Sequence, residues 1–147
     1  MNEFIVTKSV EIYAEGAAVW DALTNPEKTK KYFFHCEVFS DWKAGSPIQF
    51  KGKIFLIKEI EMNGTILDIN PGKLLKYNLK NEESDHPVSV STVTDSLSYS
   101  NGITTLTITD DVGQGEGAME RYEKSEKGWD KILKGLKELV EKESPKE

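Results

Sequence analysis

The sequence predicts an α+β fold in which a single antiparallel sheet packs against one long carboxy-terminal helix. Between residues 37 and 111, strand-like segments are separated by turn residues, and the connections are short enough for hairpins. From residue 117 to residue 142, the apolar residues change to the three- and four-residue spacing of an amphipathic helix. With 147 residues, the chain is expected to form one domain over residues 1–147.

One strand and two short helices are expected before the sheet continues. Residues 4–13, FIVTKSVEIY, alternate apolar and polar positions in period two, which predicts a strand. Residues 14–25, AEGAAVWDALTN, switch to helical spacing. The pair Asn25-Pro26 ends that helix, because the residue before a proline is disfavoured in the α region. Pro26 then suits the first turn of a second short helix over residues 26–33.

About six antiparallel strands are expected to follow. The pair Asn101-Gly102 suits the positive φ angles of a type I′ hairpin turn between two segments rich in Thr, Ser, Val and Ile. Asn63-Gly64 fits either a turn or a bulge. The predicted strands are EVFSDW (37–42), PIQFKGKIFLI (47–57), EMNGTILDI (61–69), KLLKYNL (73–79), VSVSTVTDSLSYS (88–100) and ITTLTITDD (103–111).

The last helix carries the apolar stripe that is expected to cover the sheet. Gly128 and Gly135 lie beside or within this stripe, and each lowers helix propensity by about 1 kcal/mol relative to alanine. Two such glycines suggest a close approach to the sheet, or spare room beside the helix. Residues 143–147 are expected to be a frayed tail. The stripe consists of Met119, Tyr122, Trp129, Ile132, Leu133, Leu136, Leu139 and Val140.

Composition excludes several classes of partner. The formal charge of −6 and the isoelectric point near 5.1 argue against nucleic acids and anionic membrane surfaces, which need a concentrated basic face. No apolar run is long enough to span a membrane, and the amino-terminal residues lack the pattern of a signal peptide. The single cysteine cannot form an internal disulfide, which fits a cytoplasmic protein.

No catalytic or metal-binding constellation stands out. Cys36 and His35 are adjacent, so in an extended segment their side chains point to opposite faces, and His86 lies in a polar loop. One cysteine and two scattered histidines cannot supply a zinc site. Glu61, Asp68 and Asp95 lie in strand-like segments from which they can project inward, but their spacing marks no general acid–base pair. We therefore expect no catalytic residues and no metal.

The segment GQGEGA, residues 113–118, formally fits a dinucleotide-binding pattern between a strand and a helix. However, no second parallel strand follows it, and Asp110-Asp111 would repel a pyrophosphate. We interpret the segment as a flexible loop leading into the last helix and expect no cofactor.

Residues 9–33 resemble the start of the START-like (SRPBCC) superfamily, in the branch similar to the carboxy-terminal domain of activators of the heat-shock protein 90 ATPase. Asn25 replaces the usual Asp of that pattern, and Tyr32-Phe33 stand where a Trp is common. The resemblance covers nearly the whole chain. Matching positions are Val19, Trp20, Ala22, Leu23, Thr24, Pro26, Glu27, Ser40-Asp41-Trp42, Gly45, Gly64-Thr65-Ile66-Leu67, Pro71, Leu75, Tyr77, Gly128-Trp129, Leu133 and Leu136-Lys137.

The resemblance implies a helix-grip fold: a curved antiparallel sheet of about seven strands around the long carboxy-terminal helix, with a cavity between them. Residues 30–42, KKYFFHCEVFSDW, hold five of the chain's fourteen aromatic residues, and most of these rings are expected to be ordinary core. The sharper hypothesis is a ligand cavity, because small-molecule sites are mostly apolar. Its predicted lining is Tyr32, Phe33, Phe34, Phe39 and Trp42, closed by Trp129 and Met119.

Three functions remain open. The first is non-enzymatic binding of an apolar small molecule between sheet and helix, and the second is a co-chaperone that activates the heat-shock protein 90 ATPase. The third, an enzyme of the cyclase or hydrolase kind, is weakened by the lack of a catalytic constellation. The expected partner is thus an apolar small molecule or a chaperone.

Overall fold

A computed structural model describes residues 4–54, 58–81 and 89–143. His86, which the sequence places in a polar loop, lies outside these residues. The end of the strand predicted over residues 47–57 also lies partly outside them. The order of elements confirms the prediction of one strand, two short helices, six further strands and a long helix. The elements are β1 (Ile5–Ile12), α1 (Gly16–Thr24), α2 (Pro26–Tyr32), β2 (Cys36–Ser40), β3 (Pro47–Ile54), β4 (Lys58–Asn70), β5 (Leu74–Asn81), β6 (Ser89–Ser100), β7 (Ile103–Asp111) and α3 (Ala118–Glu143).

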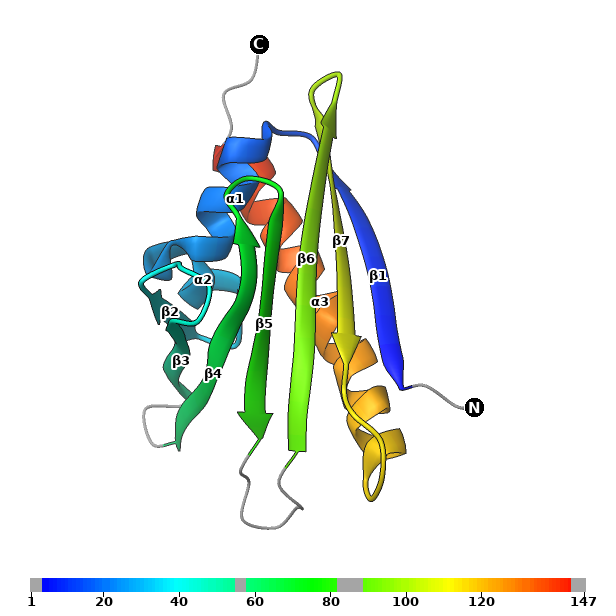
Figure 1. The fold of residues 1–147 in the computed structure, drawn as a ribbon. Helices are drawn as coiled ribbons and strands as arrows, with labels where there is room; N and C mark the ends of the chain where they lie inside the picture. Colours follow the sequence, from blue (N-terminus) through cyan, green and yellow to red (C-terminus); the bar gives the residue numbers. More distant parts are fainter. Residues whose placement is uncertain (1–3, 55–57, 82–88, 144–147) are drawn as a thin grey trace.

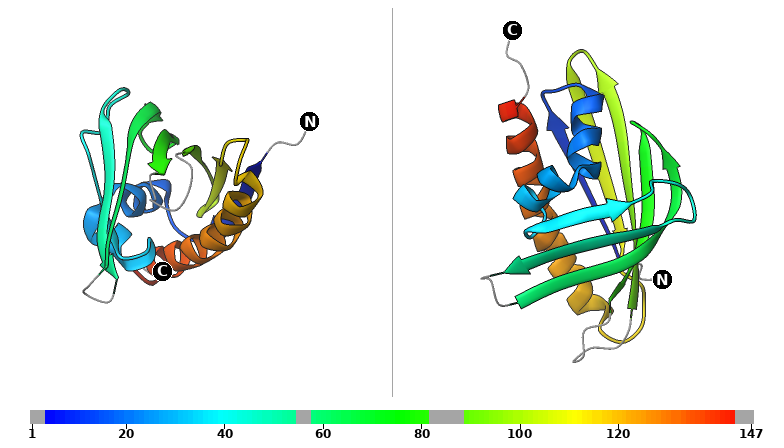
Figure 2. Two further views of the ribbon diagram at one scale, coloured as in Figure 1. Left: turned by 90° about the horizontal axis from the view of Figure 1, so that it is seen from below. Right: turned by 90° about the vertical axis from the view of Figure 1, so that its left-hand side faces the viewer.

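The seven strands form one antiparallel sheet in the order β1-β7-β6-β5-β4-β3-β2. The sheet is strongly curved, and α3 runs along its open side (Figure 1; Figure 2, left). Helix α3 contacts β1 at one edge of the sheet, while α2 contacts β2 at the other edge and also contacts α3. The interior is therefore enclosed by sheet, α3 and α2 together, as the helix-grip prediction requires.

Helix α2 is fixed to the sheet edge by its own sequence. The Asn25 side chain accepts a hydrogen bond from the backbone N–H of Glu27 at 3.0 Å, which caps the helix, and Pro26 occupies its first turn. The buried Thr29 hydroxyl accepts a hydrogen bond from the backbone N–H of Val38 in β2 at 3.1 Å. These contacts position the end of α2, and the residues that follow it, over the interior.

The turn chemistry explains the long hairpins. Asn101 and Gly102 have φ angles of 52° and 82°, which confirms a turn of the predicted kind between β6 and β7. Asn63-Gly64 is neither a turn nor a bulge but part of β4, where a Cβ on Gly64 would clash with the backbone oxygen of Asn78. Glycine is required there because β5 approaches so closely. The bulge in β4 lies instead between Ile66 and Asp68.

The core forms where the apolar stripe of α3 meets the concave face of the sheet. Trp129, Ile132, Leu133, Leu136 and Val140 are buried, which confirms the phase of the predicted stripe. Within the described residues, no helix is long and apolar enough to span a membrane.

The stripe does not extend to Met119. That side chain is 57% exposed, and Ala118 is the residue buried in the first turn of α3. Position 118 continues the inward-facing sequence that runs through Tyr122 and Trp129, whereas position 119 is rotated about 100° away from it. The prediction that Met119 faces the interior is therefore wrong.

Candidate functional site

A small cavity lies inside the molecule between the sheet and α3. Its volume is about 10 Å³, which is close to the space that a single water molecule needs. Aliphatic and aromatic side chains make up most of its lining, and one carboxyl group, that of Asp95, joins them. The lining residues are Leu23, Thr29, Tyr32, Phe33, Ile48, Phe50, Leu75, Tyr77, Asp95, Ile108, Trp129, Ile132 and Leu136.

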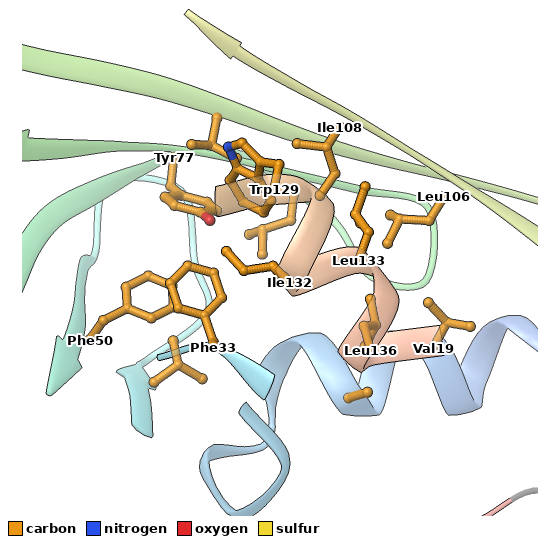
Figure 3. Close-up of a cluster of buried hydrophobic side chains, with 14 of the residues drawn as sticks. Val19, Phe33, Phe50, Tyr77, Leu106, Ile108, Trp129, Ile132, Leu133 and Leu136 are labelled. Atoms are coloured by element: carbon orange, nitrogen blue, oxygen red, sulfur yellow. The ribbon is translucent and has the colours of Figure 1, made fainter. Parts of the chain in front are cut away.

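Phe33 makes ring contacts with several aromatic residues of this interior. It follows α2, and its ring stacks on Phe50 of β3 with centroids 4.7 Å apart. The Trp129 indole and the Phe33 ring form a T-shaped pair with centroids 5.9 Å apart, and the centroids of Phe50 and Tyr77 lie 5.8 Å apart. Figure 3 shows Phe33 and Phe50 overlapping on one side of the cluster, with Trp129 and Ile132 of α3 beside them. Rings from β3, β5, α3 and the turn after α2 therefore meet at the cavity.

The segment Tyr32–Phe34 closes the interior by lying on the two glycines of α3. A Cβ on Gly135 would lie 2.9 Å from the Cβ of Tyr32, and one on Gly128 would lie 3.5 Å from the Phe34 ring. The Tyr32 hydroxyl also donates a hydrogen bond to the backbone oxygen of Ala22 at 2.6 Å. Gly135 thus allows a close approach, although to this segment and not to the sheet, whereas a Cβ at Gly128 would make an ordinary contact with Phe34.

The structure divides the seven residues predicted to line the cavity into two groups. Tyr32, Phe33 and Trp129 lie together at the cavity. The other four lie elsewhere: Phe34 is 41% exposed over α3, Met119 is exposed, and Phe39 and Trp42 border a separate open depression beside α2.

Strand periodicity explains why Phe39 faces outward. In β2 the side chains of Cys36 and Val38 are buried, so Phe39 points to the opposite face and is 45% exposed. Aromatic density along the chain does not distinguish these two faces.

Asp95 is the one acid of the three singled out in the sequence that faces the interior, since Glu61 and Asp68 are exposed. It lies on β6 between Leu75 of β5 and Ile108 of β7. Burial, with a smaller contribution from the charge of Asp110, raises the pKa of the Asp95 carboxyl from 3.8 to about 7. Its Oδ1 atom has no hydrogen-bond partner among the residues that the structure describes.

A second acid, Asp110, lies on the same face at the end of β7. Its Oδ2 atom accepts hydrogen bonds from the Ser125 hydroxyl at 2.6 Å and from the Trp129 indole N–H at 2.9 Å. Burial raises the pKa of Asp110, while these two hydrogen bonds lower it. Sequence reasoning did not find this residue as part of the site. The sequence did contain a signal for it, namely the alternation of strand residues between the two faces of a sheet. The residues of β7 that face the interior are Thr104, Leu106, Ile108 and Asp110.

The thiol of Cys36 is buried, and its Sγ atom lies 3.6 Å from the backbone oxygen of Phe34. Burial raises the pKa of this thiol from 9.0 to about 11, so the reactive thiolate is disfavoured at neutral pH. His35 is exposed, so the two neighbours do not form a dyad. In the described part of the chain, His, Cys, Asp and Glu side chains form no group of three or more able to hold a metal ion.

Cys36→Ser is expected to leave ligand binding or any other activity unchanged, because the thiol is assigned no chemical role. Serine can still donate a hydrogen bond to the Phe34 backbone oxygen, so the fold should persist. Binding and activity assays on a sample with wild-type circular dichroism check this result. Lost activity in a folded variant would show that the thiol has a chemical function.

Residues 14–141 match the model of the family described as "Activator of Hsp90 ATPase homolog 1-like protein". The chain belongs to this family. Its matched region extends from the end of β1 through nearly all of α3, so it includes every residue at the cavity. No curated protein matches the chain.

Solved structures show how widely the family's fold is shared. A solution structure from Cytophaga hutchinsonii, ChR145, is 32% identical, with 97% of each chain covered and a TM-score of 0.71. Protein MLL2253 of Mesorhizobium loti is 19% identical, with 96% of this chain and 99% of that chain covered and a TM-score of 0.80. DynU16, from the dynemicin biosynthetic locus, is 17% identical, with 98% of this chain and 49% of that chain covered and a TM-score of 0.75. These three structures therefore share the fold of this chain.

Proposed function

We propose that this protein binds an apolar small molecule between its sheet and α3, without catalysing a reaction. The observation that carries the proposal is the meeting of Phe33, Phe50, Tyr77 and Trp129 around unfilled space in the middle of the fold. Rings from different elements, with few polar groups among them, are the usual lining of a small-molecule site. The occurrence of the same fold in a biosynthetic locus, in DynU16, also supports this function.

A ligand larger than a water molecule must displace a side chain, and Phe33 is the side chain best placed to move. It lies next to Phe34 and His35, whose φ angles of 49° and 62° are in the left-handed region. Each such residue costs free energy, of order 1–3 kcal/mol at most sites where it occurs. Rearrangement of this turn would release that cost while it withdraws Phe33 from the interior. We therefore assign the role of a plug to Phe33 and that of its hinge to Phe34-His35.

A ligand that binds only the folded protein is expected to raise its melting temperature. The gain in the free energy of unfolding should be roughly 2.7 kcal/mol at a hundredfold excess over the dissociation constant. A thermal-shift screen over fatty acids, sterols, flavonoids and aromatic polyketides measures this gain.

Two substitutions on α3 distinguish interior binding from surface binding in the same screen. Ile132→Phe adds bulk to the cavity lining and should reduce the ligand-induced shift, whereas Met119→Trp adds bulk at the exposed face and should not. Each shift is compared with the melting temperature of the same variant without ligand, because overfilling a core is itself destabilising. If no class of compound raises the melting temperature, the proposal is wrong.

A second candidate function is activation of the heat-shock protein 90 ATPase, which the family description supports. An ATPase assay of that chaperone, with and without this protein, tests it directly. Stimulation that persists in Ile132→Phe would show that the chaperone function does not require the interior site.

A further inference from the structure

We infer that the interior site selects an amphipathic ligand, which places one hydrogen-bond donor, a hydroxyl or an amine, on the carboxyl group of Asp95. The rest of the ligand would occupy the space among the aromatic rings. This inference rests on the proposed function and adds the chemical class of the ligand to it.

The first observation is a buried acceptor that the fold leaves unused. The Asp95 side chain is 3% exposed and belongs to the cavity lining, and its Oδ1 atom lacks a hydrogen-bond partner within the described residues. Buried polar groups are nearly always hydrogen-bonded, because an unpaired one has lost its water without compensation. The acceptor at the cavity therefore needs a donor from outside the chain, and a donor group of the ligand could take the place of a water molecule there.

The second observation is that the fold itself has no need of a carboxyl group here. The cross-strand neighbours of Asp95 are Leu75 and Ile108, and both are buried apolar residues that also line the cavity. An apolar side chain at position 95 would continue this surface without any unpaired atom. The acid is thus costly for packing, and recognition of a ligand would give it a use.

Two of the polar atoms that face Asp95 are already engaged. The Tyr32 hydroxyl donates to the backbone oxygen of Ala22, and the Oδ2 atom of Asp110 accepts from Ser125 and Trp129. The cavity lining contains no Lys, Arg or His among the described residues, so no internal cation neutralises the acid. A donor on the ligand can supply the missing partner.

The acid suits both kinds of donor. Burial holds its pKa at about 7, so the neutral acid and the carboxylate are both populated near neutral pH, and both retain an acceptor oxygen. A neutral hydroxyl adds no charge to the interior. A protonated amine would pair with the carboxylate and would also face the rings of Phe33 and Trp129, which favour a cation.

The test compares probes that share a naphthalene ring system and carry no donor, a hydroxyl or an amine. Wild-type protein and Asp95→Leu are titrated by calorimetry with naphthalene, 2-naphthol and 1-naphthylmethylamine. In the wild type we expect a probe with a donor to bind at least about tenfold more tightly than naphthalene, because naphthalene leaves the acid unpaired. In Asp95→Leu we expect this preference to vanish while naphthalene still binds. The donor that binds more tightly identifies the neutral hydroxyl or the charged amine as the natural group.

A second pair of probes tests the role of the Asp95 carboxyl group even if the Phe33 side chain does not move aside for naphthalene. Phe33→Ala removes the plug and should leave a cavity near the size that accepts benzene. Phenol should then bind at least about tenfold more tightly than benzene, and adding Asp95→Leu should remove the difference. Both variants are checked for folding by circular dichroism, and the wild-type titrations stand by themselves if Phe33→Ala does not fold.

The outcomes separate the inference from the proposed function. Equal binding of naphthalene and its donor-bearing derivatives by the wild type would overturn the anchor role of Asp95 but leave apolar ligand binding intact. A donor preference that survives Asp95→Leu would also overturn it. If the wild type binds no probe but Phe33→Ala prefers phenol through Asp95, the anchor stands and binding in the wild type is refuted.

Discussion

Trp129→Ala is expected to lower the free energy of unfolding by about 3–5 kcal/mol, the range for loss of a buried aromatic residue. The indole contacts the Phe33 ring and donates a hydrogen bond to the Oδ2 atom of Asp110. The substitution removes both contacts at once. It also leaves Asp110 with Ser125 as its one remaining side-chain donor among the described residues, and this adds to the cost of the cavity.

Chemical denaturation measures this loss, and two further variants apportion it. Trp129→Phe keeps a ring but loses the N–H group, so it should cost less than alanine and isolate the hydrogen bond. Met119→Ala changes an exposed residue on the same helix and should alter stability by no more than about 0.5 kcal/mol. An unchanged midpoint for Trp129→Ala would contradict the phase assigned to α3.

The stability of the wild type is expected to fall as the pH rises from about 4 to about 7, because of Asp95. Its pKa is raised from 3.8 to about 7 in the folded protein, so over this range the unfolded chain loses the proton while the folded chain retains it. The difference spans about three pH units, each worth about 1.36 kcal/mol, so the decrease should be roughly 4 kcal/mol. Above pH 7 both states are ionised, and the penalty is constant.

Asp95→Asn removes this titration and should be more stable than the wild type by several kcal/mol at pH 8, with little difference at pH 4. The groups that face Asp95 are Asp110 on β7, Tyr77 on β5 and Tyr32 at the end of α2. Burial also raises the pKa of Asp110, so a smaller pH dependence of the same sign should remain in the variant.

Denaturation curves between pH 4 and pH 8 check this prediction. The exposed Asp68 provides the matched control, because Asp68→Asn should leave the curve unchanged. If the stability of Asp95→Asn follows the same pH dependence as the wild type, Asp95 does not carry the raised pKa.

Most of the fold could be predicted from the sequence because its signals are local. Each signal lies within a few neighbouring residues, and the structure confirms the elements that they predict. The signals are the period-two alternation of the strands, the pairs Asn101-Gly102 and Asn25-Pro26, and the apolar stripe of α3. Gly64 was ambiguous for the opposite reason. Its role depends on the approach of Asn78 on the neighbouring strand, and no local pattern contains that information.

The site could be predicted only in part, because the residues that line a cavity are decided by the direction in which each side chain points. Tyr32, Phe33 and Phe34 are consecutive aromatic residues, yet Tyr32 and Phe33 line the cavity while Phe34 is turned outward at a positive φ. Asp95 could be named as an acid able to face inward. Its unpaired oxygen, however, follows from the packing of four elements around it, and sequence spacing does not reveal such an arrangement.

Methyl NMR of the wild-type protein, with an apolar ligand found by the thermal-shift screen, tests interior binding most directly. Ile108, Ile132 and Leu136 line the cavity, whereas Leu67 and Val90 are exposed and serve as internal controls. We expect chemical-shift changes, and ligand-to-methyl nuclear Overhauser effects, at the three cavity residues and not at the two controls. Changes confined to Leu67 and Val90 would contradict binding between the sheet and α3.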